Sequence, residues 1–190
     1  MLWCSKFGFL MATVNLIPNA DVSSDWTLAS GSDTFEMVNE DNTGNAASDG
    51  SRVYTTTAGD QFYVALTDFT ESYSSIDSVQ VVTRTAVNTR GSTHVMRTFL
   101  TDSAGVPNQY YDESSSAIAG STGYQTTTFT ERTTYDGSHP WTNVRLDGLR
   151  VVVEVDALSI GTCHCTFVYV IVTYTPPLAT DNAIFFGCNF

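Results

Sequence analysis

The chain has 190 residues, which is the size of one domain. Its formal net charge is −12, and only 15% of its residues are charged. Its basic residues, Lys6 and the arginines, are scattered singly, so it lacks the clustered cations that neutralise phosphates in nucleic-acid-binding proteins. The negative charge opposes binding to an anionic membrane surface, and no apolar run reaches the ~18 residues of a membrane span. We therefore expect no nucleic-acid partner and no membrane partner.

Alternation of apolar and polar residues, rich in Thr, Val, Tyr and Phe, dominates the chain and is typical of strands. The predicted strands cover residues 34–38, 51–57, 61–66, 76–86, 93–102, 124–132, 149–155 and 163–174, with shorter ones near Trp26 and near Tyr110–Tyr111. Many short strands with hardly any helix predict an all-β fold, an antiparallel β-sandwich of the jelly-roll kind.

The connections between these strands predict local structure as well. Residues 58–60 and 88–92 carry Gly59 and Gly91, which suit the turns of two hairpins, one joining 51–57 to 61–66 and one joining 76–86 to 93–102. A single helical turn is expected at 141–146, because Pro140 precedes it and Gly148 follows it.

Three segments make up the expected domain organisation. Residues 1–11 are an N-terminal arm or a start-site artefact, residues 12–175 are the sandwich domain, and residues 176–190 are an apolar C-terminal tail. The tail cannot continue a central strand because it begins with Pro176 and Pro177.

Both faces of the predicted strand 163–174 are apolar. Either the strand is central and covered twice, or its outer face meets another subunit, since exposed apolar patches mark interfaces. The predicted interface residues on this strand and in the tail are Phe167, Tyr169, Ile171, Ile184, Phe185, Phe186 and Phe190.

Two sequence resemblances point to function. Residues 15–21, followed by Asp25-Trp26-Thr27, resemble the opening of galactose-binding-like jelly rolls, which include many carbohydrate-binding modules, although Ala20 replaces the usual Gly. Residues 76–84, 124–129, 140–142, 146–149 and 167–170 resemble sandwich domains of tailed-phage virion proteins, a likeness that covers about residues 12–175.

The second resemblance implies a non-enzymatic viral structural protein, a capsid decoration (cement) or virion appendage protein. It would be located in the virion, form a homo-oligomer and bind the major capsid or tail protein. The alternative is a carbohydrate-binding module that recognises surface glycans.

Aromatic side chains are the candidate glycan contacts, because sugar sites combine ring platforms with polar groups. Tyr110 and Tyr111 lie in a polar stretch and are the predicted pair, although adjacent residues of an extended chain point to opposite sides. Trp26 and Trp141 are expected in the core, and Tyr54, Tyr63 and Tyr73 are further candidates.

Catalytic and metal signatures are weak, and we predict no enzyme and no cofactor. No Gly-x-Ser-x-Gly motif is present, and the carboxylates in segments 40–49 and 112–113 are typical of solvated loops rather than of a hydrolase pair. Cys163 and Cys165 share one face of a strand while His164 points away, so this triplet does not offer three ligands to one metal. Asp41 and Asn45 are weak calcium candidates in a loop that lacks the Gly and distal Glu of an EF-hand.

Overall fold

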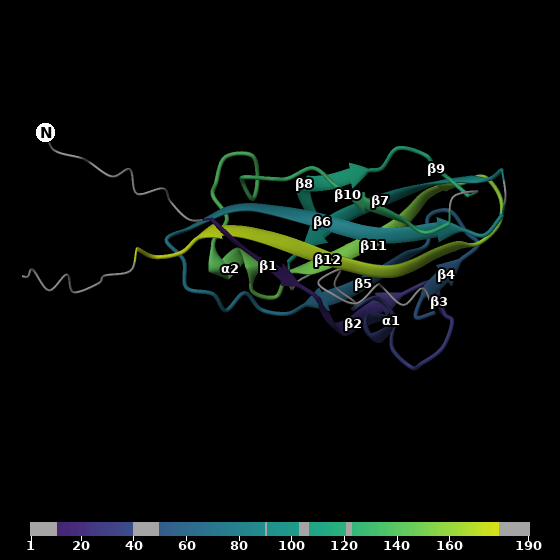
Figure 1. Cartoon of the computed structure of the whole chain (residues 1–190), viewed down its shortest axis with the longest axis horizontal. Coiled ribbons are helices and arrows are strands. Elements are labelled where there is room, and N and C mark those ends of the chain that lie inside the picture. The colour runs from purple at the N-terminus through teal and green to yellow at the C-terminus, as the bar shows by residue number, and fades with distance from the viewer. Residues whose placement is uncertain (1–10, 40–49, 90, 103–106, 121–122, 179–190) are drawn as a thin grey trace, which may run out of the picture.

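The structure is a computed structural model that describes residues 11–39, 50–89, 91–102, 107–120 and 123–178. These residues contain twelve strands and two short helices, and the strands form two stacked antiparallel sheets (Figure 1). The prediction of an all-β antiparallel sandwich of the jelly-roll kind is confirmed.

Each sheet has six strands in the described part of the chain. Sheet A runs in the order β10 (Gln125–Thr128), β6 (Ser75–Val87), β12 (Cys163–Thr175), β4 (Val53–Thr55) and β3 (Thr27–Leu28), and β1 (Ala12–Leu16) also pairs with β12. Sheet B runs in the order β2 (Pro18–Ser24), β5 (Gln61–Leu66), β11 (Arg150–Leu158), β7 (Thr93–Thr101) and β8 (Pro107–Ser114), and β9 (Ile118–Ala119) also pairs with β7.

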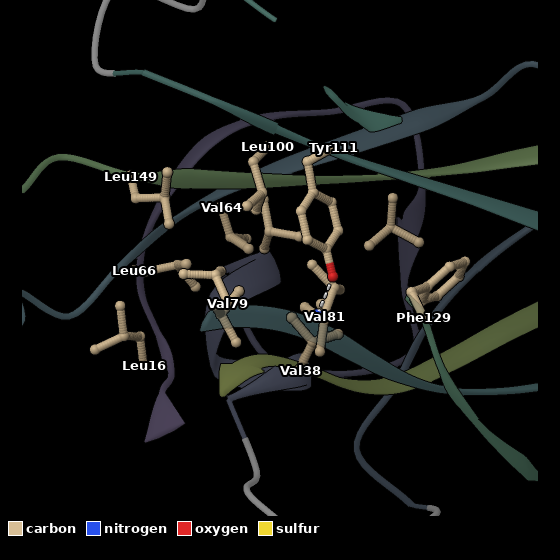
Figure 2. Packing of buried hydrophobic residues seen from close by; sticks show 14 of the residues in the cluster. Leu16, Val38, Val64, Leu66, Val79, Val81, Leu100, Tyr111, Phe129 and Leu149 are labelled. Atoms are coloured by element: carbon tan, nitrogen blue, oxygen red, sulfur yellow. Dashed lines mark hydrogen bonds between the residues drawn. The ribbon is translucent and has the colours of Figure 1, made fainter. Parts of the chain in front are cut away.

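The core lies between the sheets and is built by strict alternation along the strands. In β11, Val151, Val153 and Val155 are fully buried in the core, with Leu149 just before them. Figure 2 labels further core residues from both sheets and from segments outside them, which are Leu16, Val38, Val64, Leu66, Val79, Val81, Leu100, Tyr111 and Phe129. Trp26 and Trp141 are 5% and 2% exposed, so their predicted place in the core is confirmed.

Both predicted hairpins are wrong. β4 belongs to sheet A and β5 to sheet B, and in the same way β6 belongs to sheet A and β7 to sheet B. The short connections are turns, with Gly59 and Gly91 at φ values of +91° and +81°, but each turn crosses from one sheet to the other. Alternation shows which face of a strand is apolar, and it does not show which strand is the neighbour.

The predicted strand at 34–38 is also wrong, because this segment is helix α1 (Thr34–Val38). Its buried residues Thr34, Met37 and Val38 follow helical spacing. The N-terminal amides of Thr34 and Phe35 donate to the carboxylate of Asp21 in β2, at 2.7 and 2.6 Å. A carboxylate distant in sequence thus caps the helix, while the side chain of the local N-cap residue, Asp33, makes no capping hydrogen bond although Glu36 follows it at capping-box spacing.

Helix α2 (Asn143–Leu146) confirms the predicted helical turn, although it begins two residues later than expected. Neither helix in the described residues is long and apolar enough to cross a membrane.

Candidate functional site

A row of three rings lies on the outer face of sheet A, at the end where β4, the end of β6 and the start of β12 meet (Figure 1). Cys163 and Cys165 point into the core, so the alternation of β12 turns His164 outward between them, as the sequence predicts. His164 pairs in register with Tyr54 of β4 on one side and with Ala86 of β6 on the other.

Tyr124 completes the row beyond β6, immediately before β10. The ring centroid of His164 lies 6.0 Å from that of Tyr54 and 6.4 Å from that of Tyr124. All three side chains are half-buried, so each presents part of its ring to solvent. We call Tyr54, His164 and Tyr124 the aromatic row.

Two adjoining hollows of about 350 and 360 Å³ open along the aromatic row, and together we call them the groove. They share the side chains of Arg52, Asn88 and His164. The first is lined in addition by Ala29, Tyr54 and Thr162, and the second by Ala86, Val87, Gly120, Gly123 and Tyr124.

Polar groups occupy fixed positions in the groove. The side-chain oxygen Oδ1 of Asn88 accepts a hydrogen bond of 2.9 Å from the backbone N–H of Thr162, which anchors the side-chain amide at the rim. Burial, together with the positive charge of Arg52, lowers the pKa of His164, so the imidazole is neutral at pH 7. Its Nδ1 is buried and has no hydrogen-bond partner in the part of the chain that the structure describes.

The positive side chain of Arg84 lies beside the aromatic row. Its guanidinium carbon is 5.6 Å from the centre of the Tyr124 ring, in the range of a cation–π contact. Arg84 and Ala86 alternate with Thr85 along β6, so both belong to the outer face of sheet A.

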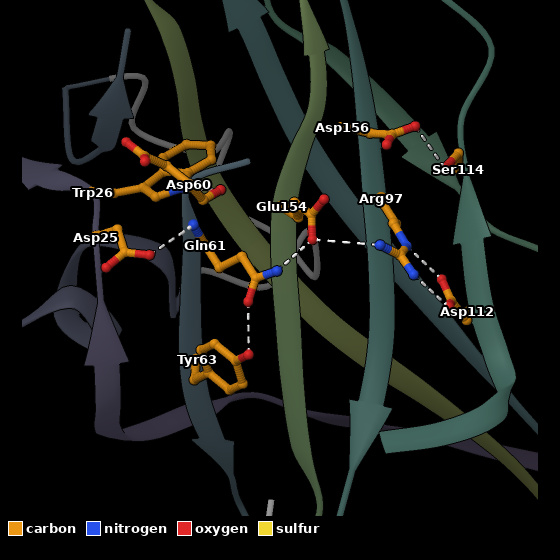
Figure 3. Close-up of polar contacts among 10 residues, drawn as sticks. All are labelled: Asp25, Trp26, Asp60, Gln61, Tyr63, Arg97, Asp112, Ser114, Glu154 and Asp156. Carbon is orange, nitrogen blue, oxygen red and sulfur yellow. Dashed lines mark hydrogen bonds and ion pairs between the residues drawn. The ribbon is translucent and has the colours of Figure 1, made fainter. Parts of the chain in front are cut away.

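A polar network covers the outer face of sheet B instead (Figure 3). Arg97 binds both carboxylate oxygens of Asp112 at 2.6 Å and lies 3.6 Å from Glu154. Glu154 also accepts a hydrogen bond from the side-chain amide of Gln61, which in turn accepts one from the Tyr63 hydroxyl. The bond from Arg97 lowers the pKa of Asp112, which keeps this carboxyl ionised.

Of the candidate carboxylates for a hydrolase pair, the two in the described residues, Asp112 and Glu113, are each held by neighbouring side chains. Asp112 is held by Arg97, and Glu113 accepts hydrogen bonds from Thr130 and lies 3.5 Å from Arg132. Glu113 also lines a third hollow of about 370 Å³ beside Ser114, Ser115 and Ser116, whose aromatic residue, Phe129, is 2% exposed. The remaining candidates, Glu40, Asp41 and Asp49, lie outside the described residues.

Tyr111 is wrong as a glycan contact. Its side chain is 1% exposed within the core, and its hydroxyl oxygen accepts a hydrogen bond from the backbone N–H of Val81. The side chain of Tyr110 lies outside the described part of the chain.

The predicted subunit contacts on β12 are occupied within the chain. Phe167 and Tyr169 are 1% and 7% exposed and form an outer cluster with Val82, against which Ile17 and the half-buried Ile171 pack. The structure thus favours the first alternative for this strand, in which both of its faces are covered. Ile184, Phe185, Phe186 and Phe190 lie outside the described residues, and their contact role stays a prediction.

The sequence offers candidate metal ligands at two places, the loop of Asp41 and Asn45 and the triplet 163–165. Asp41 and Asn45 lie outside the described residues. Within the described ranges, no group of three or more His, Cys, Asp or Glu side chains is placed to hold a metal ion.

The fold and groove define a β-sandwich with an aromatic and basic recess on one sheet face. Similar solved structures include an arabinose-bound α-L-arabinofuranosidase, with a TM-score of 0.46 and 13% identity over 80% of this chain and 22% of that chain. They also include a CBM4 carbohydrate-binding module, with a TM-score of 0.43 and 12% identity over 78% of this chain and 79% of that one. A xylan-binding CBM15 module has a TM-score of 0.41 and 12% identity over 90% and 100% of the two chains.

No family model and no curated protein sequence matches this chain. The named likenesses assign it no ligand, and the expected place in a virion stays a prediction, as does the homo-oligomer.

The sequence indicated only part of this groove. Tyr54 was one of several candidate platforms, and His164 was correctly placed on the outer side of its strand. Arg52, Asn88 and Tyr124 come from separate segments, and only the pairing of β4, β12 and β6 brings them together.

Proposed function

We propose that this protein is a non-catalytic glycan-binding domain and that the groove along the aromatic row is its binding site. The observation that carries the proposal is the row itself, because the partly exposed rings of Tyr54, His164 and Tyr124 lie next to one another along the groove, with interplanar angles of 44° and 62° to His164. Sugar rings have an apolar face that packs on aromatic rings and hydroxyl groups that hydrogen-bond to neighbouring polar side chains.

The dimensions of the groove favour a chain of sugars over a single one. The two hollows adjoin through shared residues and are open to solvent, so successive sugar units have room to lie along the face of the sheet. Arg52, Asn88 and His164 stand where the hollows meet and supply hydrogen-bonding groups to both.

Among the described residues, neither hollow of the groove is lined by a carboxylate that would serve as acid or nucleophile in glycoside hydrolysis. Glycan recognition needs only the rings and the polar edge that are present. The proposal is the alternative function predicted from the sequence, a carbohydrate-binding module. The predicted role in a virion has its own test, which is co-sedimentation of the protein with purified capsids.

Affinity electrophoresis through gels that contain soluble xylan, cellulose derivatives or pectin tests the proposal. We expect at least one polysaccharide to retard the protein, and Tyr54→Ala and Tyr124→Ala to weaken that retardation by about tenfold in affinity. Tyr63→Ala is the matched control, because Tyr63 is a half-buried tyrosine on the outer face of the opposite sheet.

Unaltered mobility in every gel would contradict the proposal. So would a loss of retardation in Tyr63→Ala with the two variants of the aromatic row unaffected.

A further inference from the structure

We infer that the groove binds three consecutive units of one isolated glycan chain, with one unit on each ring of the aromatic row, and that it does not bind the flat face of a crystalline polysaccharide. This inference rests on the proposed function and adds the length and the packing state of the ligand. It comes from the spacing, the tilt and the depth of the three rings.

The rings of the aromatic row follow one another at the spacing of sugar units. The ring centroid of His164 lies 6.0 Å from that of Tyr54 and 6.4 Å from that of Tyr124, which is comparable to the length of one pyranose unit in a linear chain. The two tyrosines lie on opposite sides of His164, because β4 and β6 flank β12. Tyr54 lines the first hollow, Tyr124 lines the second, and His164 lines both, so the row continues from one hollow into the other.

The three rings do not share a plane. The plane of the His164 ring makes an angle of 44° with that of Tyr54 and of 62° with that of Tyr124. A crystalline surface presents its sugar rings in parallel, so it does not stack on His164 and on a tyrosine tilted against it at the same time. Successive units of an isolated chain rotate about their glycosidic bonds and can follow the tilt from ring to ring.

The floor of the groove lies below the rings. Ala86 pairs in register with His164, is 6% exposed and lines the second hollow together with Gly120 and Gly123. Small residues between half-buried rings leave a recess that one chain can enter, whereas a rigid flat surface reaches only its rim.

The polar side chains of the groove are concentrated beside the middle ring. Arg52, Asn88 and His164 line both hollows, and the amide of Asn88 is held in place by the backbone N–H of Thr162. The middle sugar unit therefore has polar neighbours as well as a ring, and the two outer units depend most on the rings of Tyr54 and Tyr124.

Oligosaccharides of graded length test the inference by isothermal titration calorimetry on the full chain. The probes are cello-, xylo- and galacturono-oligosaccharides of one to six units, which correspond to the polysaccharides in the gels. In at least one series we expect the affinity to rise about fivefold with each unit up to the trisaccharide and to change by less than about twofold beyond it.

Removal of an end ring is expected to shorten the site by one unit. In Tyr54→Ala and in Tyr124→Ala the trisaccharide should bind about fivefold more weakly, while the disaccharide keeps its affinity within about twofold, because two rings remain. General destabilisation would instead weaken all lengths in the same proportion. Tyr63→Ala on the opposite sheet is the matched control and should keep the rise up to three units. A circular dichroism melting curve for each variant shows that it remains folded.

Two cellulose preparations of the same chemistry test the packing state. We expect microcrystalline cellulose to deplete none of the protein from solution, and amorphous cellulose to deplete it where the cello-oligosaccharides bind. Depletion by the microcrystalline form to the same extent as by the amorphous form would show that the site accepts a flat surface.

The outcomes separate this inference from the proposed function. Equal affinity for the monosaccharide and the trisaccharide, an unchanged length dependence in both tyrosine variants, or equal depletion by the two celluloses overturns the inference and leaves glycan binding standing. Binding of no oligosaccharide in any series overturns the inference as well, and retardation in the polysaccharide gels then decides whether the proposed function survives.

Discussion

The hydroxyl of Tyr111 accepts a hydrogen bond from the backbone N–H of Val81 and thereby joins sheet B to sheet A through the middle of the core (Figure 2). Val81 lies in β6 at the point where the ladder to β10 has ended at Thr128, although its carbonyl still accepts from the N–H of Phe129. The phenol of Tyr111 therefore satisfies a buried donor of the other sheet.

Removal of this one hydroxyl is expected to destabilise the protein. Tyr111→Phe keeps the buried ring and leaves the Val81 N–H without its partner, so we expect a loss of about 1–3 kcal/mol in the free energy of unfolding. Chemical denaturation measures the loss, and Tyr63→Phe, whose hydroxyl bonds to Gln61 at the surface, is expected to lose less than about 1 kcal/mol. An equal loss in the free energy of unfolding for the two variants would show that the hydrogen bond across the core stabilises the protein no more than the one at the surface.

A second contact between the sheets makes stability depend on pH. His94 of β7 is 1% exposed, with its Nε2 3.0 Å from the hydroxyl of Thr85 in β6. Burial lowers the pKa of His94 from 6.5 to about 4. Between these two values the unfolded chain binds the proton and the folded chain does not, so stability is full above pH 6.5 and falls as the pH decreases towards 4.

His94→Gln tests this linkage, because glutamine hydrogen-bonds and does not titrate. Between pH 7 and pH 4, the native protein should lose about 3 kcal/mol more of its free energy of unfolding than the variant. Denaturant titrations at a series of pH values measure both curves. Parallel curves would mean that His94 has the same pKa in the folded and unfolded chains.

Gly120 supports one wall of the groove and leaves no room for a side chain. A Cβ at this position would lie 2.4 Å from Cγ1 of Val87 and 2.5 Å from the backbone oxygen of Thr89. Gly120→Ala is therefore expected to lower the free energy of unfolding by about 1–3 kcal/mol and to weaken glycan binding, because Val87 and Gly120 both line the groove.

Gly59→Ala is the comparison for this prediction. A Cβ at this position would meet nothing within 4 Å and Gly59 lines neither hollow of the groove, but its φ of +91° disfavours alanine by about 1–2 kcal/mol. It should thus lose stability and retain glycan binding. A loss of binding in Gly59→Ala would show that the effect at Gly120 reports general destabilisation.

The two cysteines of β12 are expected to be inert in the folded protein. Cys163 and Cys165 are fully buried free thiols, and burial raises the pKa of Cys163 to about 12 and that of Cys165 above its usual range. In a chain in which Cys4 and Cys188 are replaced by Ser, a thiol-reactive dye should label neither remaining cysteine until denaturant is added. Labelling of the folded protein as fast as that of an exposed thiol would place these side chains at the surface.

The sequence predicted individual strands well because alternation is a local property. The bounds of β5 are recovered in full, and the apolar face of β11 follows from the spacing of its valines. Partnership between strands is not local, and for this reason both predicted hairpins failed. The residues of each connection suit a turn whether the chain returns to the same sheet or crosses to the other.

Helix α1 and Tyr111 show the same limit for single residues. The alternation at 34–38 predicts a strand, although Asp33 and Glu36 have the spacing of a helix start, and the carboxylate that caps the helix is Asp21 of another strand. Alternation at Tyr110–Tyr111 indicates that the two rings point to opposite sides, and only the position of sheet A reveals that Tyr111 is the inner one. The groove escaped prediction for this reason too, since its rings belong to three segments joined by sheet pairing.

The most direct test of the account is to map where a sugar binds. Backbone amide chemical shifts are recorded by NMR while a bound oligosaccharide is titrated into the full chain. If the groove is the binding site, the largest changes fall at Tyr54, His164, Asn88 and Tyr124, with little change around Gln61, Tyr63 and Glu154 on the opposite sheet. Changes concentrated on sheet B, with the residues of the groove unmoved, would contradict it.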